Sequence, residues 1–319
     1  MSGETTGNVP AVSVVVPVFN GERTVGRLLK ALLSQLPSPL GEHELIFVNN
    51  DSTDGTAAIL ETAGNRVVIV KESKRGAAAA RNAGLRAARG KIVAFLDADS
   101  VPARTWLREI TAPFTDPDVT LVAGGTASFP PKTGAQRFAA AYGLGDALHC
   151  VEDPVMPYAN TRNMGVRREA ALRIGGFAEE LPSVEDVDFS VRLREATGCA
   201  IEYREAAFAF HDDREDDESL RKQALLYGRG TAAMYERYPQ VLPWGTKQRL
   251  RRFKRANTRR LIAALASLRL KVRLIDPEAA EFAHYIDMWD TAFWQGFEIE
   301  RRERAAHAGA AATAAATAK

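Results

Sequence analysis

The sequence has few cysteines and no long apolar run. Its two cysteines, Cys150 and Cys199, are too few for a disulfide framework and have no zinc-site spacing. No apolar segment approaches the roughly 18 residues that a membrane-spanning helix needs. Residues 1–10 lack the basic and apolar regions of a secretion signal. We therefore expect a cytoplasmic protein, either soluble or peripheral on the inner face of a membrane.

Two common nucleotide-binding signatures are also missing. The segment Gly143-Leu144-Gly145 lacks the rest of a dinucleotide fingerprint, and no Gly-x-x-x-x-Gly-Lys-Ser/Thr segment occurs. The formal net charge is +2, which gives no reason to expect a nucleic-acid partner. Hydrophobic residues make up 46% of the 319 residues, enough for a sizeable core. The length and composition indicate one large or two modest globular domains. The missing motifs argue against NAD and P-loop chemistry.

Strand-like and helix-like segments alternate over the first hundred residues. Residues 12–16 are a β-branched run, and residues 25–36 place leucines and valine at helical spacing. This alternation favours right-handed crossovers and a parallel sheet. The expected strands are 12–16, 44–48, 66–70 and the run that ends at Asp97, with helices at 25–36, after Thr56 and at 76–88.

Beyond residue 100 the alternation is less regular. The expected helices are 105–114, 134–150, 168–174 and one that begins near Val184, with strands at 119–123, 200–203 and 206–210 and a polar loop at 151–165. The expected domains are a flexible segment 1–10, an α/β domain 11–235 with halves at 11–100 and 101–235, a helical extension 236–304 and a disordered Ala/Thr tail 305–319.

The apolar run 91–96 is followed by two carboxylates, Asp97 and Asp99. Side chains at i and i+2 of an extended segment point the same way, so both should face one point beyond the strand. Open α/β sheets bind ligands at this edge. Converging carboxylates repel each other unless a cation lies between them, and oxygen ligands suit Mg²⁺ or Mn²⁺, which in turn suit a diphosphate. The alternative is a solvated polar strand end.

Six further segments occur in the order and spacing of one enzyme family. They are 15–20 (VVPVFN), 48–56 (VNNDSTDGT), 76–84 (GAAAARNAG), 163–177, 185–193 (EDVDFSVRL) and 211–230. Over roughly 11–235 the chain thus resembles the family-2 glycosyltransferases. The resemblance implies the GT-A fold, an α/β fold with a mostly parallel central sheet, to which this chain adds a C-terminal helical extension. It also implies metal-dependent transfer of a sugar from a nucleotide-diphospho-sugar, expected to be a UDP-sugar, to a hydroxyl of a glycan, lipid-linked or small-molecule acceptor.

The resemblance also assigns donor and metal sites. The nucleotide-sugar would be bound by Pro17, Phe19, Asn20, Asn50, Arg81, Asp97 and Arg229. The divalent cation, Mn²⁺ or Mg²⁺, would be bound by Asp99, Asp97 and His211. Residues 227–230 would form a flexible element over the diphosphate, with Arg229 as a planar phosphate donor. The competing interpretations are a surface arginine for Arg81 and a structural hydrogen-bonding histidine for His211.

One segment departs from the family pattern. The turn after the second strand usually carries an acidic pair, whereas this chain has Asn49 and Asn50. In the family the second residue of the pair tends to read the nucleotide base, and asparagine can both donate and accept hydrogen bonds. The substitution leaves the identity of the nucleotide open.

An acceptor hydroxyl needs a base, because its pKa is too high for it to attack unaided. By resemblance, Asp186 is this base, and a single base with in-line displacement implies inversion at the anomeric carbon. Glu185 would hydrogen-bond the acceptor. Both residues also suit the first turn of a helix, where the macrodipole favours acids. Asp188 and Arg192 are spaced for a helical ion pair.

A basic segment at 247–260 leads into the apolar residues 261–265. It is a solvated helix face, a surface for a partner helix, or a site for an anionic membrane through residues 247–265. The aromatic-rich stretch 280–298 packs on its own chain or forms a homodimer contact. The acidic run 212–218 is more typical of a solvated loop and helix start than of a second metal site.

Two rival functions fit the same kind of sheet. A nucleotidyltransferase usually has a glycine-rich basic loop directly after its first strand, whereas this chain has residues 17–22, PVFNGE. A non-catalytic sugar-binding or scaffold protein needs no catalytic carboxylates, whereas Asp97, Asp99 and Asp186 are all present. Both observations favour the glycosyltransferase.

Overall fold

The computed structural model describes residues 9–243, 245 and 276–317. Contacts divide the chain into two compact units. The α/β unit comprises Met1–Phe129, Gly145–Glu179 and Glu185–Asp212, and the helical unit comprises Pro130–Leu144, Glu180–Val184 and Asp213–Lys319. Each unit has its own architecture.

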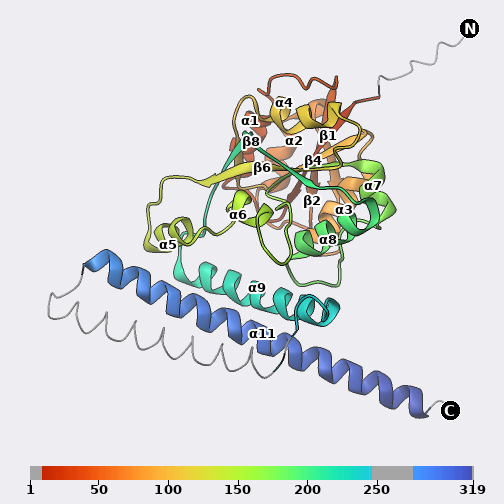
Figure 1. Ribbon diagram of the computed structural model, residues 1–319. Helices are drawn as coiled ribbons and strands as arrows, with labels where there is room; N and C mark the ends of the chain where they lie inside the picture. The colour runs from red at the N-terminus through yellow and green to blue at the C-terminus, as the bar shows by residue number, and fades with distance from the viewer. Residues whose placement is uncertain (1–8, 244, 246–275, 318–319) are drawn as a thin grey trace, which may run out of the picture. The chain divides into compact units, whose positions relative to one another are not determined.

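The first half of the α/β unit is a parallel sheet covered on both faces (Figure 1). Its strands are β1 (Val12–Val18), β2 (His43–Asn49), β3 (Val68–Lys71) and β4 (Ile92–Leu96). Alternate residues of β1 point to opposite faces: Val14 packs with α1 (Val25–Leu32), and Val15 packs with α3 (Ala77–Ala87). A strand buried on both faces must be apolar throughout, which explains the valine run of β1.

The remaining strands turn this arrangement into a mixed sheet. They are β5 (Ser100–Pro102), β6 (Leu121–Ser128), β7 (Asn163–Arg167) and β8 (Ile201–His211). Within the described residues, eight strands are ordered β3-β2-β1-β4-β7-β6-β8-β5. Four of the seven pairings are parallel (β1-β2, β1-β4, β2-β3 and β6-β8), and three are antiparallel. The α/β fold with a mostly parallel sheet is therefore confirmed, and the sheet runs continuously across residue 100.

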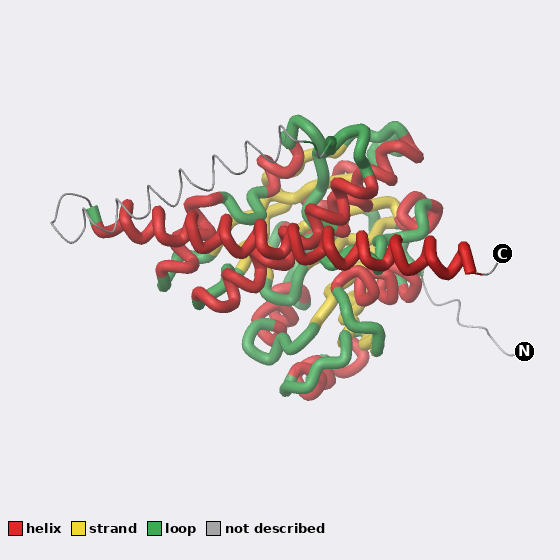
Figure 2. The backbone as a smooth tube through the Cα atoms, turned by 90° about the horizontal axis from the view of Figure 1, so that it is seen from below, coloured by secondary structure: helices red, strands yellow, loops and turns green. Residues whose placement is uncertain are grey.

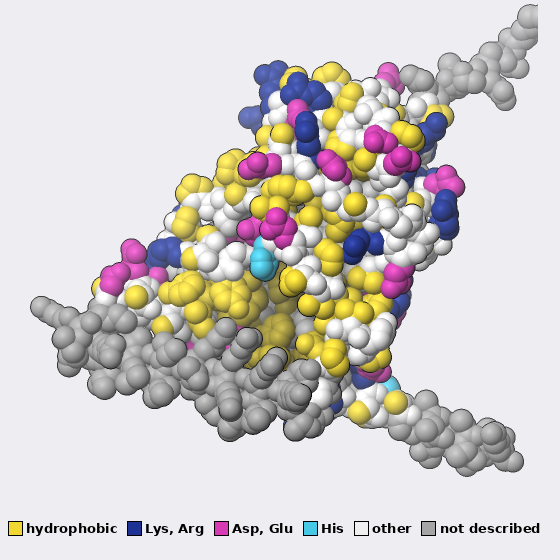
Figure 3. Space-filling view, in the orientation of Figure 1, with side chains coloured by type: hydrophobic (Ala, Val, Ile, Leu, Met, Phe, Trp, Pro, Cys, Tyr) yellow, Lys and Arg dark blue, Asp and Glu magenta, His cyan; other side chains and the backbone are white. Residues whose placement is uncertain are grey.

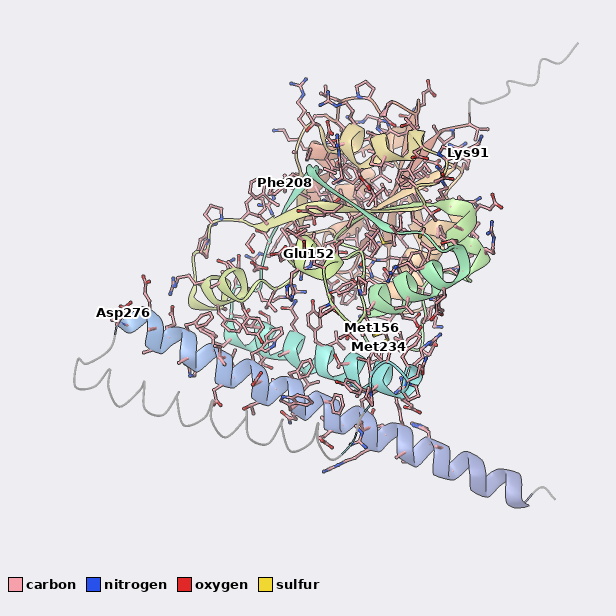
Figure 4. The ribbon with its side chains drawn as sticks, viewed as in Figure 1. Lys91, Glu152, Met156, Phe208, Met234 and Asp276 are labelled. Atoms are coloured by element: carbon pink, nitrogen blue, oxygen red, sulfur yellow. The ribbon has the colours of Figure 1, made fainter. Side chains whose placement is uncertain are left out.

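Four further helices lie along the α/β unit. They are α2 (Thr56–Glu61), α4 (Trp106–Thr111), α7 (Arg168–Arg173) and α8 (Glu185–Thr197). The strands predicted at 200–203 and 206–210 form the single strand β8, whose register against β6 shifts between Gly124 and Thr126. β8 pairs with β6 on both sides of this β-bulge, so the two predicted segments belong to one strand. Figure 4 labels Phe208 on β8, whose carbonyl accepts a hydrogen bond from the Ala103 amide.

The helix predicted over 134–150 is wrong as a single helix. It is two helices, α5 (Gly134–Tyr142) and α6 (Ala147–Val151). Gly143 and Gly145 between them have φ values of 73° and 85°, a left-handed conformation that ends a helix and favours glycine. The polar loop predicted at 151–165 ends earlier than expected, because β7 begins at Asn163.

The helical unit is built on α9 (Asp217–Arg237) and α11 (Pro277–Thr317), which pack side by side (Figures 1 and 2). Aromatic side chains of α11 pack with α5, and the ring centroids of Phe138 and Tyr285 are 5.7 Å apart. A side chain at Gly228 of α9 would collide with the Phe293 carbonyl, and one at Gly296 of α11 would collide with the Leu225 carbonyl. The two helices therefore approach through their backbones.

The C-terminal segments differ in part from expectation. The tail 305–319 was expected to be disordered, yet α11 continues through Thr317. Alanine has the highest helix propensity, so a run of alanine extends a helix that packing has already nucleated. The basic segment 247–265 lies outside the described residues. In the described part of the chain, no helix combines the length and apolar character needed to cross a membrane.

Charges of both signs are interspersed on the described surface of the face drawn in Figure 3. Ion pairs of the α/β unit include Arg89 with Glu44 at 2.9 Å and Arg204 with Glu109 at 2.6 Å. In both pairs the arginine is exposed and the carboxylate is largely covered.

Candidate active site

The loops after β1 and β2 are joined into one edge at the carboxyl ends of these strands. The Asn20 amide donates to Ser52 Oγ at 3.0 Å, and Asn20 Oδ1 accepts from the Thr53 amide at 2.8 Å. The Gly21 amide donates to Thr56 Oγ1 at 2.8 Å. Asn20 has a φ of 49°, which asparagine adopts more readily than most residues. Asn20, predicted to bind the nucleotide-sugar, thus also shapes the edge where the donor is expected.

Phe19 and Pro17 lie on the same edge, and Phe19 leaves 48% of its surface exposed. An exposed phenylalanine at a ligand-binding edge is suited to stacking on a flat group. Asn50, in contrast, is 4% exposed. Its Nδ2 donates to the carbonyls of Glu72 and Lys74 at 2.9 and 2.7 Å, and its Oδ1 accepts from the Gly76 amide at 2.9 Å.

The structure uses the Asn50 side chain within the protein, and the base contact predicted for it stays a prediction. Both of its amide hydrogens are used on the loop between β3 and α3, so the side chain braces that loop. The sequence could not reveal this, because the partners of Asn50 are backbone carbonyls more than twenty residues away.

Asp97, Asp99 and His211 come together at the end of β4. Their ligand atoms lie within 4.8 Å of one another, and His211 Nε2 is 2.9 Å from Asp99 Oδ1. His211 is the last residue of β8 and pairs with Ser100 of β5, which places its ring beside the carboxylates. Two carboxylates and an imidazole form a donor set that suits Mn²⁺ or Mg²⁺, and such a cation would offset the repulsion between the carboxylates. The three residues fit a divalent cation.

A second group of side chains, which the sequence analysis missed, surrounds the backbone of His211. The Phe129 amide donates to the His211 carbonyl at 3.1 Å, and the Asp212 amide donates to the Asp99 carbonyl at 3.1 Å. Arg27 of α1 pairs with the Asp212 carboxylate and places its guanidinium 4.6 Å from the centre of the Phe129 ring. These contacts fix the backbone on both sides of the candidate metal site, at Asp99 and at His211. Their sequence separations of up to 185 residues gave no local signal.

Arg81 connects Asp97, one of the three residues of the candidate metal site (Asp97, Asp99 and His211), with α8, the helix that carries the predicted base. It is 5% exposed, donates to Asp97 at 2.8 Å, and pairs with Glu185 at the start of α8. Its neighbouring carboxylates raise its pKa further, against the opposing effect of burial. The structure thus places Arg81 in contact with two of the predicted site residues, Asp97 and Glu185. The guanidinium lies between two acidic elements rather than on the surface.

Asp186, predicted to be the base, has a carboxyl whose pKa is raised. Burial raises the pKa of its carboxyl to about 7, and the nearby Glu185 carboxylate adds to the rise, whereas Arg81 lowers it. Asp186 Oδ1 accepts from the Val187 amide at 3.0 Å, and Oδ2 lies 3.5 Å from the Thr161 amide. A carboxyl that titrates near neutral pH is matched to proton transfer.

The turn that precedes α8 is held by buried polar contacts. Asn82 donates to the Phe177 carbonyl at 2.9 Å and accepts from the Phe177 amide at 2.8 Å. Arg192 pairs with the fully buried Asp188 and donates to the carbonyls of Ile174 and Gly176 at 2.6 and 2.7 Å. The ion pair expected between Asp188 and Arg192 is confirmed. It also fixes the turn that leads toward Glu185 and Asp186.

Asn163 ties together three elements beneath the site. Its Oδ1 accepts from Trp106 Nε1 at 2.7 Å, and its Nδ2 donates to the carbonyls of Gly125 and Ala207 at 2.9 and 2.7 Å. Asn163 is 1% exposed, so losing these bonds would leave several polar groups without partners in the core. Its segment was recognised from the sequence, but its role was not.

Residues 227–230, which were predicted to form a flexible element over the diphosphate, are helical in the structure. They lie inside α9, where Tyr227 packs edge-on against Trp289 and Gly230 lies against Ser183. Arg229 pairs with Glu300 at 2.8 Å and Glu303 at 2.5 Å on α11. The guanidinium therefore joins two helices of the helical unit, and its contact with a phosphate stays a prediction.

Comparisons with known proteins identify the family of the chain. Residues 13–175 match the model of the family described as glycosyl transferase family 2. The chain is 31% identical over 224 residues to glycosyltransferase AglE of Haloferax volcanii, covering 68% of this chain and 72% of that protein. It is 33% identical over 234 residues to the pre-mycofactocin glycosyltransferase of Mycobacterium tuberculosis, covering 72% of this chain and 48% of the relative.

A solved structure shows the same fold. The mannosyltransferase PcManGT from Pyrobaculum calidifontis, in complex with GDP-Man and Mn²⁺, superposes with a TM-score of 0.55 at 20% identity over 97% of this chain and 80% of its own. The chain belongs to glycosyl transferase family 2 and is a glycosyltransferase with the GT-A fold. The resemblance drawn from its short segments is confirmed at this level.

Proposed function

We propose that the chain transfers a sugar from a nucleotide-diphospho-sugar to an acceptor hydroxyl with inversion at the anomeric carbon. The observation that supports this most directly is the position of Arg81, which contacts both Asp97 of the metal cluster and Glu185 beside Asp186. One buried side chain thereby connects Asp97, which belongs to the proposed cation site, with Glu185, the neighbour of the proposed base Asp186. This is the arrangement that a direct displacement requires.

In this proposal Asp186 accepts the proton of the acceptor hydroxyl as the oxygen attacks the anomeric carbon. Glu185 has the Arg81 guanidinium as a partner, and Asp186 takes the proton. The bond between the anomeric carbon and the diphosphate oxygen breaks on the opposite face. A single base acting in line gives inversion of configuration.

A divalent cation would be held by Asp97, Asp99 and His211, and when bound it offsets negative charge on the departing diphosphate. The presence of Mn²⁺ with GDP-Man in PcManGT supports this part of the proposal. Arg81 keeps one Asp97 oxygen in a fixed position by a hydrogen bond of 2.8 Å. Asp99 and His211 are already within contact distance of each other.

The acceptor is proposed to be a hydroxyl compound, and a lipid-linked acceptor would suit the basic segment 247–265. That segment is known here only from its sequence. Flotation with vesicles of anionic lipid tests the membrane contact, and absence of the protein from the vesicle fraction would contradict it. Size-exclusion chromatography with light scattering tests the homodimer.

The reaction itself is tested with a panel of nucleotide-sugars, a set of acceptor alcohols, and either Mn²⁺ or EDTA. We expect metal-dependent release of a nucleoside diphosphate together with a glycoside of inverted configuration in the NMR spectrum. A separate incubation with nucleoside triphosphates and sugar 1-phosphates tests the nucleotidyltransferase, which would release pyrophosphate and form a nucleotide-diphospho-sugar. Retained configuration would contradict the role of Asp186 as the only base.

A further inference from the structure

The segment 157–161, which leads into β7, follows one face of α8. Every second residue of the segment contacts every fourth residue of the helix through a backbone group. The three contacts are those of the Thr161 amide with Asp186 Oδ2 at 3.5 Å, the Ala159 amide with Ser190 Oγ at 3.2 Å, and the Pro157 carbonyl with Arg194 Nη1 at 3.5 Å. The segment and the helix therefore run in opposite directions with their contacts in step.

The contacts stay in step because the repeats of the two chains match. Four residues of an α-helix rise about 6 Å, and two residues of an extended chain span about 6.6 Å. Alternate residues of an extended chain also face opposite sides. In agreement with this, the intervening Tyr158 donates its amide to the Cys150 carbonyl of α6 at 3.0 Å. The segment is thus bonded to a different helix on each side.

Ser190 lies in the middle of this row of contacts. Ser190 and Ala159 are both 0% exposed, and Thr161 is 3% exposed. A buried amide without a partner costs free energy comparable with a lost hydrogen bond. Ser190 Oγ therefore fixes the backbone at Ala159, and it thereby limits the movement of Thr161 two residues further along the chain.

We infer, on the basis of the proposed function, that Ser190 is a positioning residue for the base: through Ala159 it keeps the Thr161 amide directed at the Asp186 carboxylate. Asp186 Oδ1 accepts from the Val187 amide at 3.0 Å. With an amide at each oxygen, the carboxylate has one preferred orientation. Each oxygen has more than one lone pair, so a position for the proton of the acceptor hydroxyl remains.

The Thr161 amide also affects the pKa of the base. Donation to the ionised carboxylate lowers the pKa of Asp186, as Arg81 does, whereas burial and the Glu185 carboxylate raise it. Loss of the Thr161 contact should therefore raise this pKa further. Burial raises the pKa of the nearby Cys150 thiol to about 11, so this group adds no charge near neutral pH.

Ser190→Ala removes the hydroxyl without adding atoms. The assay uses the nucleotide-sugar and acceptor alcohol that give turnover in the wild-type chain, with Mn²⁺. We expect kcat to fall by about tenfold or more, since small misplacements of a reacting group have effects of this size, and KM for the donor to stay the same. The pH–rate profile should move to higher pH. A profile that stays in place would overturn the inference, whatever happens to kcat.

Ser13→Ala is the matched control. Ser13 is also 0% exposed, and its Oγ accepts from the Gly90 amide at 2.9 Å. It lies near the amino end of β1, whereas the candidate site lies at the carboxyl ends of the strands. Both substitutions remove a buried hydroxyl that accepts from a backbone amide, so both should lower the Tm. Only Ser190→Ala should move the pH–rate profile, and equal movement in the two variants would reject the role of Ser190.

Thermal unfolding tests the same contact without a substrate. The difference in Tm between chains with and without Asp186→Asn varies with pH up to the pKa of Asp186 and levels off above it. We expect it to level off near pH 7 in the otherwise wild-type chain and in Ser13→Ala, and at higher pH in Ser190→Ala. The same pH in all three would overturn the inference.

The two measurements separate the inference from the proposed function. If no nucleotide-sugar gives turnover in the wild-type chain, the proposed function fails, and thermal unfolding still decides whether Ser190 acts on Asp186. If Ser190→Ala does not fold, Ser190→Cys takes its place, because a thiol fills the position of the hydroxyl but accepts hydrogen bonds only weakly. The expected shifts then have the same direction.

Discussion

Asp186 is the residue whose environment bears most directly on activity. Its pKa is raised to about 7, chiefly by burial, so the ionised base is scarce in acid and abundant above neutral pH. We expect kcat/KM to rise with pH through about 7 and then to level off. A profile flat from pH 5 to 9 would contradict the assignment.

Replacing this carboxyl tests the same residue in another way. Asp186→Asn keeps the shape of the side chain but cannot accept a proton, so we expect kcat to fall by about 10²–10⁴. Donor binding should change little.

The same variant changes how stability depends on pH. Because the pKa of the Asp186 carboxyl is raised by folding, its contribution to the free energy of unfolding is fully present below the ordinary pKa of an aspartate and is lost as pH rises through about 7. The variant should therefore be at least as stable as wild type at pH 8, which thermal unfolding measures.

Two substitutions of Arg81 distinguish the effect of its positive charge from the effect of its size. Arg81→Lys retains a cation between Asp97 and Glu185, whereas Arg81→Gln leaves the partly exposed Asp97 and the buried Glu185 without it. Because Arg81 lowers the pKa of Asp186, we expect the pH–rate profile of Arg81→Gln to move to higher pH and that of Arg81→Lys to move less. Breaking a buried pair also costs about 3–5 kcal/mol in the free energy of unfolding. A profile that stays in place in Arg81→Gln would show that Arg81 only supports the fold.

At the scale of elements, the contact between α9 and α11 depends on two glycines. A methyl group at Gly228 would collide with the Phe293 carbonyl, so the helices would have to separate. We expect Gly228→Ala to lower the free energy of unfolding by about 1–3 kcal/mol, measured by calorimetry. Gly26→Ala in α1 is the control, since a side chain there meets only Ile59 at 3.6 Å. It should be neutral or stabilise by about 0.4–1 kcal/mol. Equal effects of the two substitutions would contradict the close helix contact.

The sequence predicted those elements whose signals are local. The strand ending at Asp97 and the helix beginning at Glu185 follow from hydrophobic pattern and acidic first turns, and the structure contains both. The roles of Asn50, Asn163 and Arg229 could not be predicted in this way. Their partners lie 22 or more residues away in the chain, and a polar side chain shows nothing in the sequence about which backbone or helix it will meet.

At the scale of the whole molecule, ligand binding should be visible as added stability. A ligand that binds only the folded chain stabilises it by about 2.7 kcal/mol at a hundred times its Kd. We expect the preferred nucleoside diphosphate to raise the Tm in Mn²⁺ and to raise it much less in EDTA. His211→Ala should weaken the metal-dependent part of the shift, because it removes one of the three side chains proposed to hold the cation. An identical shift in EDTA would show that binding does not need the cation.

The two glycines at the contact of α9 and α11 also carry an evolutionary consequence. Neither position can gain a side chain while the other helix stays in place, since each faces a carbonyl of its neighbour. Relatives that inherited the long C-terminal helix should therefore keep small residues at both positions together. In relatives without this helix, no neighbouring carbonyl restricts the position equivalent to Gly228. We expect larger residues there in those relatives.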